Sequence, residues 1–315
     1  MANYEGMLLV TNNAIYQYAT NKVTKIGDLT NNSYRNKISF KGELYFFEYF
    51  DQNIIFYKIN GLTKIKIKQI LFPQNLIIKC VNFVQSTMGD LLVYYLYQKR
   101  EQTGLYIEYQ NLLTSHQTLI FDDEIQFNEI FASCSLFGSD YFVVTFPEDK
   151  TKKLIRFHNY QWDIIASFRD TETKNVLMMV INNYLYIGLD MVLYRVTNSL
   201  KPTLVVETMF EDNPIISLIA TPSWDNNYYL YLLLNDGSLY RNNILNNDLV
   251  LITKVVSNEN AILTVKFMNF CDNIIITGQQ IQDNLKNYIF FFITKDKNIV
   301  FQKLTDNLNI IDIWV

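Results

Sequence analysis

Histidine, cysteine and glycine are scarce in this sequence, and each shortage removes a class of chemistry. There are 2 histidines, 3 cysteines and 10 glycines among 315 residues. His116 and His158 lie in or beside polar turns, where a structural histidine is a simpler interpretation than a catalytic base. No two glycines have a Gly-x-Gly spacing and no Gly-x-Ser-x-Gly occurs, so neither a phosphate-binding loop nor a hydrolase nucleophile is indicated.

The three cysteines are too far apart in the sequence to form a familiar metal or redox motif. Cys80, Cys134 and Cys271 each lie in or beside an apolar run, and none belongs to a Cys-x-x-Cys pair. This pattern is typical of reduced thiols that pack as small hydrophobic groups. We therefore expect no metal, no cofactor and no catalytic residue. These expectations together predict a protein that is not an enzyme.

The charge balance and the apolar runs exclude two kinds of partner. The net charge of −4 gives no basic surface of the kind that nucleic-acid binding needs, so we expect no nucleic-acid partner. The most apolar stretch, residues 176–189, is interrupted by Asn182 and Asn183, so no membrane span is predicted. The opening residues MANYEGMLLV lack the basic region of a secretory signal, which predicts a protein of the cytoplasm or one incorporated into a virus particle.

What is abundant points to an all-β protein. Aromatic residues make up 15% of the chain, and short apolar runs alternate with polar turns without a sustained helical period. Asparagine tolerates the left-handed backbone of tight turns better than other non-glycine residues, so we expect asparagine pairs to replace glycine at hairpins. These pairs are Asn12-Asn13, Asn31-Asn32, Asn182-Asn183, Asn226-Asn227, Asn242-Asn243 and Asn246-Asn247.

A hairpin pattern recurs at intervals of about 45 residues, the length of a four-stranded propeller blade. The copies span residues 43–59, 90–109, 140–157, 183–196 and 227–241. An apolar run precedes and follows each copy, which predicts four strands per unit. The alternating segment 64–68 (KIKIK) fits an outermost strand whose lysines protect a sheet edge, and burial is expected to fall steadily from the first strand of a unit to the last.

These features predict a β-propeller of about seven four-stranded blades, with residues 1–315 as a single domain. The start of the sequence supplies only three strands, so the last strand, residues 309–315, is expected to complete the first blade. Residues 260–307 can be divided in two ways. We favour strands at 262–270, 273–280, 288–294 and 298–304, against an alternative in which the tail becomes an outer strand. Six or eight blades, or two stacked sandwiches, are the other architectures open at this point.

Charged loops on one face of such a propeller are the predicted partner-binding surface, because binding residues concentrate on loops held by a rigid scaffold. The candidate residues are Lys99, Arg100, Glu101, Lys150, Lys152, Lys153, Asp122, Asp123 and Glu124. The loops expected between blades are acidic, and they also contain Glu129, Asp170, Glu172, Glu211, Asp212 and Glu259. Such a set could hold a calcium ion or provide two carboxylates about 5–10 Å apart for glycoside hydrolysis, but a solvated loop surface is the simpler interpretation.

The resulting hypothesis is a non-enzymatic structural protein, a scaffold for protein–protein interaction within a larger assembly. Abundant residues with AT-rich codons indicate an AT-rich genome, such as that of a bacteriophage, a large virus, a ciliate or a low-GC bacterium. Among these sources we favour a viral protein, such as a virion or phage tail component, whose partners are other proteins. The alternative is a carbohydrate-binding or glycoside-hydrolysing propeller that uses the acidic loops and aromatic platforms such as Trp162 or Trp224. A coat or adaptor propeller of a cellular complex is a third hypothesis, which differs from the first only in its partners.

Overall fold

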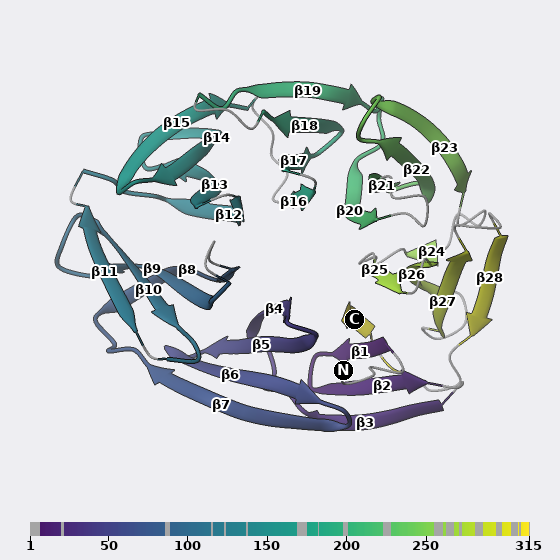
Figure 1. Ribbon diagram of the computed structural model, residues 1–315, viewed down its shortest axis with the longest axis horizontal. Helices are drawn as coiled ribbons and strands as arrows, with labels where there is room; N and C mark the ends of the chain where they lie inside the picture. The colour runs from purple at the N-terminus through teal and green to yellow at the C-terminus, as the bar shows by residue number, and fades with distance from the viewer. Residues whose placement is uncertain are drawn as a thin grey trace. The chain divides into compact units, whose positions relative to one another are not determined.

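The computed structural model of this chain consists of β-strands connected by turns and loops (Figure 1). The structure describes residues 7–19, 22–85, 89–114, 116–122, 124–136, 138–168, 175–181, 183–197, 201–222, 228–254, 261–262, 268–270, 273–280, 286–293, 298–303, 308 and 310–314. Within these residues no helix has the length and hydropathy needed to cross a membrane.

The chain divides into two compact units. The first contains Met1–Glu48, Tyr57–Lys66 and Met209–Val315, and the second contains Tyr49–Phe56 and Ile67–Thr208. The sheet β4-β5-β6-β7 is divided between them and consists of β4 (Tyr34–Phe40), β5 (Glu43–Phe50), β6 (Asn53–Asn60) and β7 (Thr63–Leu71).

The first unit holds three further sheets. One has the order β29-β1-β2-β3, with β1 (Met7–Thr11), β2 (Ala14–Ala19), β3 (Lys22–Asp28) and β29 (Ile310–Trp314). A second has β20 (Ile215–Pro222), β21 (Tyr228–Leu234), β22 (Ser238–Asn243) and β23 (Asp248–Lys254). The third has β24 (Ala261–Ile262), β25 (Met268–Phe270), β26 (Asn273–Gln280), β27 (Lys286–Ile293) and β28 (Asn298–Lys303).

The second unit is built from three sheets of consecutive antiparallel strands. The first has β8 (Leu76–Gln85), β9 (Leu91–Lys99), β10 (Leu105–Asn111) and β11 (Gln117–Asp122). The next has β12 (Glu129–Leu136), β13 (Ser139–Phe146), β14 (Asp149–His158) and β15 (Gln161–Ser167). The last has β16 (Val176–Ile181), β17 (Tyr184–Leu189), β18 (Val192–Val196) and β19 (Leu204–Met209), whose final residue is assigned to the first unit.

The predicted fold class is confirmed, because the sheets are blades of a β-propeller. The prediction of seven four-stranded blades is wrong, since six sheets have four strands and the sheet of residues 261–303 has five. The segment 262–270, expected to be one strand, contains two short strands that pair with opposite ends of β26. Ala261 is opposite Gln280, and Phe270 is opposite Asn273.

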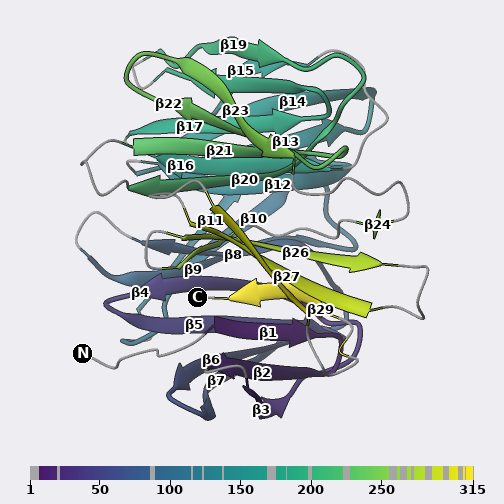
Figure 2. The ribbon, with the colours of Figure 1, turned by 90° about the vertical axis from the view of Figure 1, so that its right-hand side faces the viewer.

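The last strand of the sequence pairs with the first, as predicted. Leu8 lies opposite Trp314 and Val10 opposite Asp312, and Figure 2 shows β29 beside β1. Trp314 is 1% exposed, and its ring centroid lies 4.8 Å from that of Phe46 on β5. Of the two divisions of residues 260–307, the one that leaves the tail for the first sheet is therefore correct.

Burial does not fall steadily from the first strand of a sheet to the last, contrary to the prediction. The second strand is the most buried: seven of the eight residues of β13 are buried, whereas β12 has one buried residue at its end. A second strand has a neighbour along both edges, whereas a first strand has a neighbour along one edge only, and its side chains lie closer to solvent. The last strands are the most exposed, in line with the prediction for segment 64–68.

Several outer strands contain a β-bulge that the sequence analysis did not predict. The register of β2 with β3, of β14 with β15 and of β22 with β23 shifts by one residue. The residues skipped by these registers are Ile26, Ile165 and Ile252. A bulge lets two consecutive residues face the neighbouring strand and increases the local twist, which makes the free edge of the strand a poor template for another chain.

Asparagine supplies some of the turns, but not all those predicted. Asn32, Asn183 and Asn247 have positive φ, as expected for asparagine in place of glycine. The predicted turn at Asn242 and Asn243 is wrong, because both residues lie inside β22 and pair with β21. The pair 12–13 does form a bend, but without positive φ, and Asn182 and the pair 226–227 lie outside the described residues.

Candidate protein-interaction surface

The register of the sheet β8–β11 places the predicted charged residues at one end of that sheet. Lys99 at the end of β9 lies opposite Leu76, and Asp122 at the end of β11 lies opposite Leu105. The turn between β9 and β10 and the loop that leaves β11 toward β12 therefore share one end of the sheet, as predicted.

The exposed members of the set are the turn residues. Arg100 and Glu101 are exposed, and the backbone of Arg100 is fixed by donation of its N–H to the carbonyl of Asn75 at 2.9 Å. Glu124 is also exposed, whereas the half-buried Asp122 accepts hydrogen bonds from the N–H groups of Glu124 (2.9 Å) and Ile125 (3.3 Å). Asp122 thus holds the loop in shape through its carboxylate.

The predicted lysines of β14 are used within the protein. Lys152 is 5% exposed, and its ammonium lies 4.8 Å from the centre of the Phe131 ring. Lys153 forms an ion pair of 2.8 Å with Asp149. Neither side chain presents a free charge to a partner. Asp123 and the side chain of Lys150 lie outside the described residues.

The acidic loops do not form a metal site in the part of the chain that the structure describes, where no three potential ligands are grouped. Glu129, Glu211 and Asp212 are exposed. Asp170, Glu172 and Glu259 lie outside the described residues.

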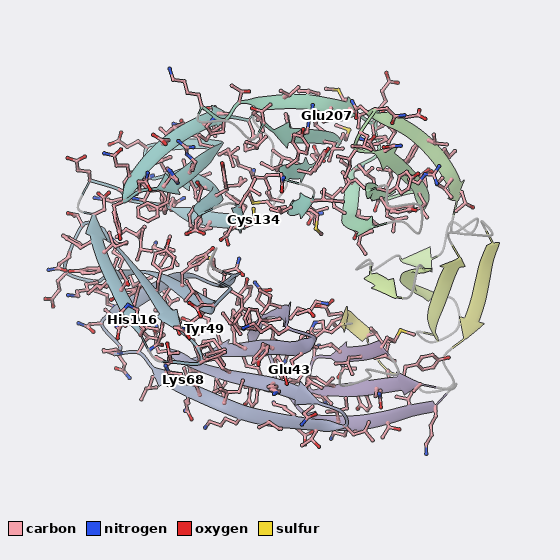
Figure 3. The ribbon with its side chains drawn as sticks, viewed as in Figure 1. Glu43, Tyr49, Lys68, His116, Cys134 and Glu207 are labelled. Carbon is pink, nitrogen blue, oxygen red and sulfur yellow. The ribbon has the colours of Figure 1, made fainter. Side chains whose placement is uncertain are left out.

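The two histidines have structural surroundings. His116 is exposed and lies just before β11 (Figure 3). The Nδ1 atom of His158 lies 2.9 Å from the hydroxyl of Ser139, which is 6% exposed. Among the described residues no carboxylate contacts His158, so this pair lacks the third group of a catalytic triad and joins the ends of β13 and β14.

Trp162, a candidate aromatic platform, is enclosed by other rings. Its centroid lies 4.7 Å from that of Phe157, 5.2 Å from that of Phe127 and 5.6 Å from that of Phe142. A sugar needs an open aromatic face, so Trp162 gives the carbohydrate hypothesis no support. Trp224 lies outside the described residues.

An aromatic row that the sequence analysis missed crosses the sheet β8–β11 beside the charged turn. Tyr97 and Tyr106 stack with centroids 5.2 Å apart, and Tyr106 contacts Phe121 at 4.4 Å. Phe72 contacts Tyr97 at 6.3 Å, and the Lys99 ammonium lies 4.4 Å from the centre of the Tyr106 ring. Burial is the main cause that raises the pKa of Tyr97 to about 12, so its hydroxyl stays protonated at neutral pH.

The aromatic row ends at an apolar strand edge. Phe121 is 48% exposed and Leu119 is 54% exposed, both on β11. Ile164 on β15 and Val206 on β19 are also more than half exposed. In the first unit, Leu251 on β23 is similarly exposed. Singly exposed apolar side chains are common on protein surfaces, whereas neighbouring ones, such as Leu119 and Phe121 on one face of β11, are typical of surfaces that bind another protein.

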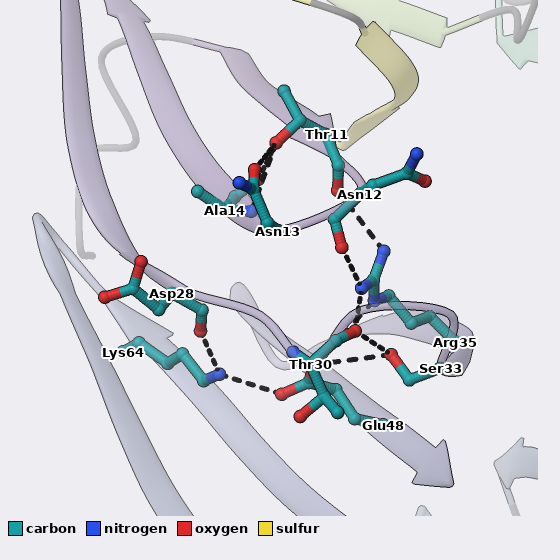
Figure 4. A network of polar contacts seen from close by, with 10 residues as sticks. All are labelled: Thr11, Asn12, Asn13, Ala14, Asp28, Thr30, Ser33, Arg35, Glu48 and Lys64. Carbon is teal, nitrogen blue, oxygen red and sulfur yellow. Dashed lines mark hydrogen bonds and ion pairs between the residues drawn. The ribbon is translucent and has the colours of Figure 1, made fainter.

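The most buried carboxylate of the first unit is enclosed by donors (Figure 4). Glu48 on β5 is fully buried, and its Oε1 accepts the N–H of Thr30 at 2.6 Å. Its Oε2 lies 2.8 Å from the ammonium of Lys64, which also donates to the carbonyl of Asp28 at 2.6 Å. Arg35 lies 3.8 Å from Oε1. Glu48 therefore holds together β3, β5 and β7 and has no exposed oxygen for catalysis.

A carboxyl group of the second unit is buried and held in the same way. Asp140 on β13 is 7% exposed and accepts hydrogen bonds from the hydroxyls of Tyr109 on β10 and Ser135 on β12. Burial raises the pKa of Asp140 above its ordinary value, and the two hydroxyl donors oppose that rise. Because both oxygens of this carboxyl group are engaged, it connects neighbouring sheets.

No family model matches the chain, and no curated protein matches it either. Solved structures that resemble it include the extracellular domain of the putative one-component system BT4673 from B. thetaiotaomicron, with 13% identity and a TM-score of 0.56. That match covers 97% of this chain and 46% of the other, so this chain spans about half the length of that relative.

Two further solved structures also resemble this chain. A puromycin-hydrolyzing peptidase from Mycobacterium tuberculosis has 10% identity and a TM-score of 0.56, over 96% of this chain and 53% of the peptidase. Apo AztD from Citrobacter koseri has 8% identity and a TM-score of 0.55, over 98% of this chain and 96% of AztD. At these identities the likeness shows the β-propeller fold alone, because one fold serves many functions.

Proposed function

We propose that this protein is a non-enzymatic scaffold that binds other proteins of a larger assembly. The observation that carries the proposal is the exposure of apolar side chains along outer strands, above all Leu119 and Phe121 on β11. Exposing such groups to water is unfavourable, by roughly 25 cal/mol for each Å² that a partner could cover. A partner that covers them would therefore be stabilised on binding.

The buried acidic groups support the same proposal. Glu48, Asp140 and Glu207 have buried side-chain carboxyl groups, and hydrogen bonds or ion pairs within the protein engage all three. A general acid or base must reach a substrate, whereas these carboxyl groups are buried and held by partners within the protein. The further proposal that the assembly is a virion or phage tail rests on the residue usage of the sequence.

The test is cross-linking mass spectrometry on the native assembly, captured through a tag on this chain. We expect cross-links from one defined set of proteins to the β9–β10 turn and to the outer strands of the second unit. The charge reversal Arg100→Glu should weaken capture of those proteins at least fivefold, since Arg100 is exposed in that turn. The control is Lys22→Glu, an exposed charge on β3 of the first unit. The proposal would be contradicted if the tagged chain captured no defined neighbour and was a monomer in its native extract.

A further inference from the structure

Strand β11 has one open edge, and its free backbone groups can be assigned. Antiparallel pairs alternate between residues that exchange hydrogen bonds and residues that do not. The N–H of Asn111 donates to the carbonyl of His116 at 2.8 Å, so this pair is a bonded one. Counting in twos from His116 along the unbroken register with β10 gives the other residues bonded to β10, Thr118, Ile120 and Asp122. The residues between them therefore direct their N–H and C=O groups to the open edge: Gln117, Leu119 and Phe121.

The same three residues have exposed side chains. Exposure alternates strictly along β11, with every second residue exposed and the residues between them half-buried. Leu119 and Phe121 therefore offer both apolar surface and backbone hydrogen-bonding groups to anything that lies along the edge. This is the surface to which an extended chain can add as a further strand.

Five other outer strands have features that oppose such addition. β3 and β7 carry lysines, two on β3 and three on β7. β15 and β23 are bulged, and in β19 the neighbouring residues Val205 and Val206 are both exposed, which breaks the alternation. β11 has no lysine, arginine or proline and no register shift with β10. Its edge thus lacks the features that normally prevent strand addition.

A positive charge lies beside one end of this edge. The ammonium of Lys99 lies over Tyr106, whose ring contacts that of Phe121. Among the residues that the structure describes, no carboxylate forms an ion pair with Lys99. A carboxylate on an incoming strand, placed next to the residue that faces Phe121, would supply the missing counter-charge.

We infer that β11 is a docking strand for an extended segment of a partner protein. The segment has apolar side chains at alternate positions, to meet Leu119 and Phe121, and an acidic residue at the end near Lys99. It pairs through its backbone with Gln117, Leu119 and Phe121 and adds a fifth strand to the sheet β8–β11. This inference rests on the proposed scaffold function and names the kind of partner that one of its surfaces binds.

The probe is a displayed library of random linear peptides, each of about nine residues, selected on the purified protein. We expect selected peptides to alternate apolar and polar residues, to lack proline and to contain an acidic residue at one end. Hydrogen exchange with a selected synthetic peptide should slow at the amides of Leu119 and Phe121, which point to the open edge. Protection confined to other strands would overturn the inference.

The decisive variant is Leu119→Pro. Proline removes the N–H group that faces the open edge, while the bonded pairs of β10 and β11 on either side of Leu119 remain. We expect peptide affinity to fall at least tenfold. Lys99→Glu should reduce the affinity for peptides with an acidic end and leave that for neutral ones unchanged.

Ile164→Pro is the matched control, because Ile164 is 62% exposed and lies on the edge strand β15. The two-residue turn at Asn159 and Tyr160 makes His158 and Gln161 a bonded pair, so Ile164 also directs its N–H outward. This variant should bind the peptides as the wild type does. Equal binding by Leu119→Pro and wild type, with both folded by circular dichroism, would refute the docking strand.

Two results separate this inference from the proposed function. If cross-linking finds a defined partner that Leu119→Pro captures as well as the wild type does, the scaffold function stands and the docking strand is refuted. If the protein instead forms a dimer that Leu119→Pro dissolves, the occupant is a second copy and the inferred partner is wrong.

Discussion

Two glutamates on the same strand show how position decides what an ion pair contributes. Glu43 and Glu48 both lie on β5, and both contact a lysine, Lys58 at 2.5 Å and Lys64 at 2.8 Å. The side chain of Glu43 is 37% exposed, whereas that of Glu48 is fully buried. Water screens the ion pair of Glu43, whereas protein donors take the place of water around Glu48. The two carboxylates therefore contribute differently to the stability of the folded protein.

We predict that Glu48→Gln lowers the free energy of unfolding by about 3–5 kcal/mol, since it leaves the ammonium of Lys64 and the guanidinium of Arg35 without their anion. Glu43→Gln, the control on the same strand, should change it by less than about 1 kcal/mol. Urea denaturation of both variants, followed by circular dichroism, measures the difference. Equal losses would show that Glu48 is not the centre of this network.

Asp140 gives a prediction about pH. Burial raises its pKa in the folded protein, so the folded state retains the proton more strongly than the unfolded state does. The contribution of this group to stability is therefore fully present below the ordinary aspartate pKa of 3.8 and is lost as the pH rises through the raised value. Asp140→Asn, which can still bond to Tyr109 and Ser135, should remove that loss.

The measurement is the pH dependence of the urea midpoint for wild type and Asp140→Asn, from pH 4 upward. We expect the difference between the two proteins to shift in favour of the variant as the pH rises. Asp163→Asn is the control, because Asp163 forms an accessible ion pair with Arg156. A constant difference between wild type and Asp140→Asn at every pH would contradict the assignment of a raised pKa.

At the scale of elements, the last strand of the sequence is a structural part of the first sheet. Trp314 packs on Phe46, and its indole N–H donates to Asp312 at 2.9 Å. We predict that Trp314→Ala lowers the free energy of unfolding by about 3–5 kcal/mol, because it opens a cavity in a core that cannot fully collapse. Ile311→Ala on the same strand, where Ile311 is 41% exposed, should cost less than about 1 kcal/mol.

Thermal and urea unfolding of the two β29 variants provide the check. A small effect of both substitutions would mean that β29 can detach without loss of the core around Phe46. A large effect of both would mean that strand pairing, rather than the buried indole, carries the stabilisation.

The sequence predicted the elements whose signal is local. Apolar hairpins at 43–59 and 140–157 and the lysine-rich outer strand needed only alternation and turn residues, and all three are present. The pairing of the tail with β1 followed from a count of strands. The bulges at Ile26 and Ile165 were missed, because an isoleucine in a bulge looks like any other strand residue.

The candidate surface was predicted only in part, for a related reason. Arg100, Glu101 and Glu124 are exposed as expected, because turns lie at the surface. Lys152 is buried over Phe131, which sequence could not show, since the position of that ring depends on the pairing of β12 with β13. The edge of β11 was missed because only a comparison with other outer strands distinguishes it. β3, β7, β15, β19 and β23 have lysines, bulges or a broken alternation of exposure, and β11 has none of these.

At the scale of the whole molecule, we predict that the chain unfolds as one domain. The sequence predicts a single domain, whereas the contacts divide the residues into two compact units. Strands β5, β6 and β7 each contribute residues to both units, so neither unit has a complete set of strands of its own. Partial sheets are unstable in isolation because they expose unpaired backbone groups, which favours cooperative unfolding.

Tryptophan fluorescence can follow the two units separately. Trp162 belongs to the second unit, and residues 224 and 314 belong to the first. In Trp162→Phe the signal reports on the first unit, and in the double variant Trp224→Phe/Trp314→Phe it reports on the second. For each variant we expect the urea transition seen by fluorescence to coincide with the one seen by circular dichroism, which responds to all sheets. Two domains would give a different result, because each unit would then unfold at its own urea concentration. The urea midpoint seen by fluorescence would be lower than the one seen by circular dichroism in one variant and higher in the other.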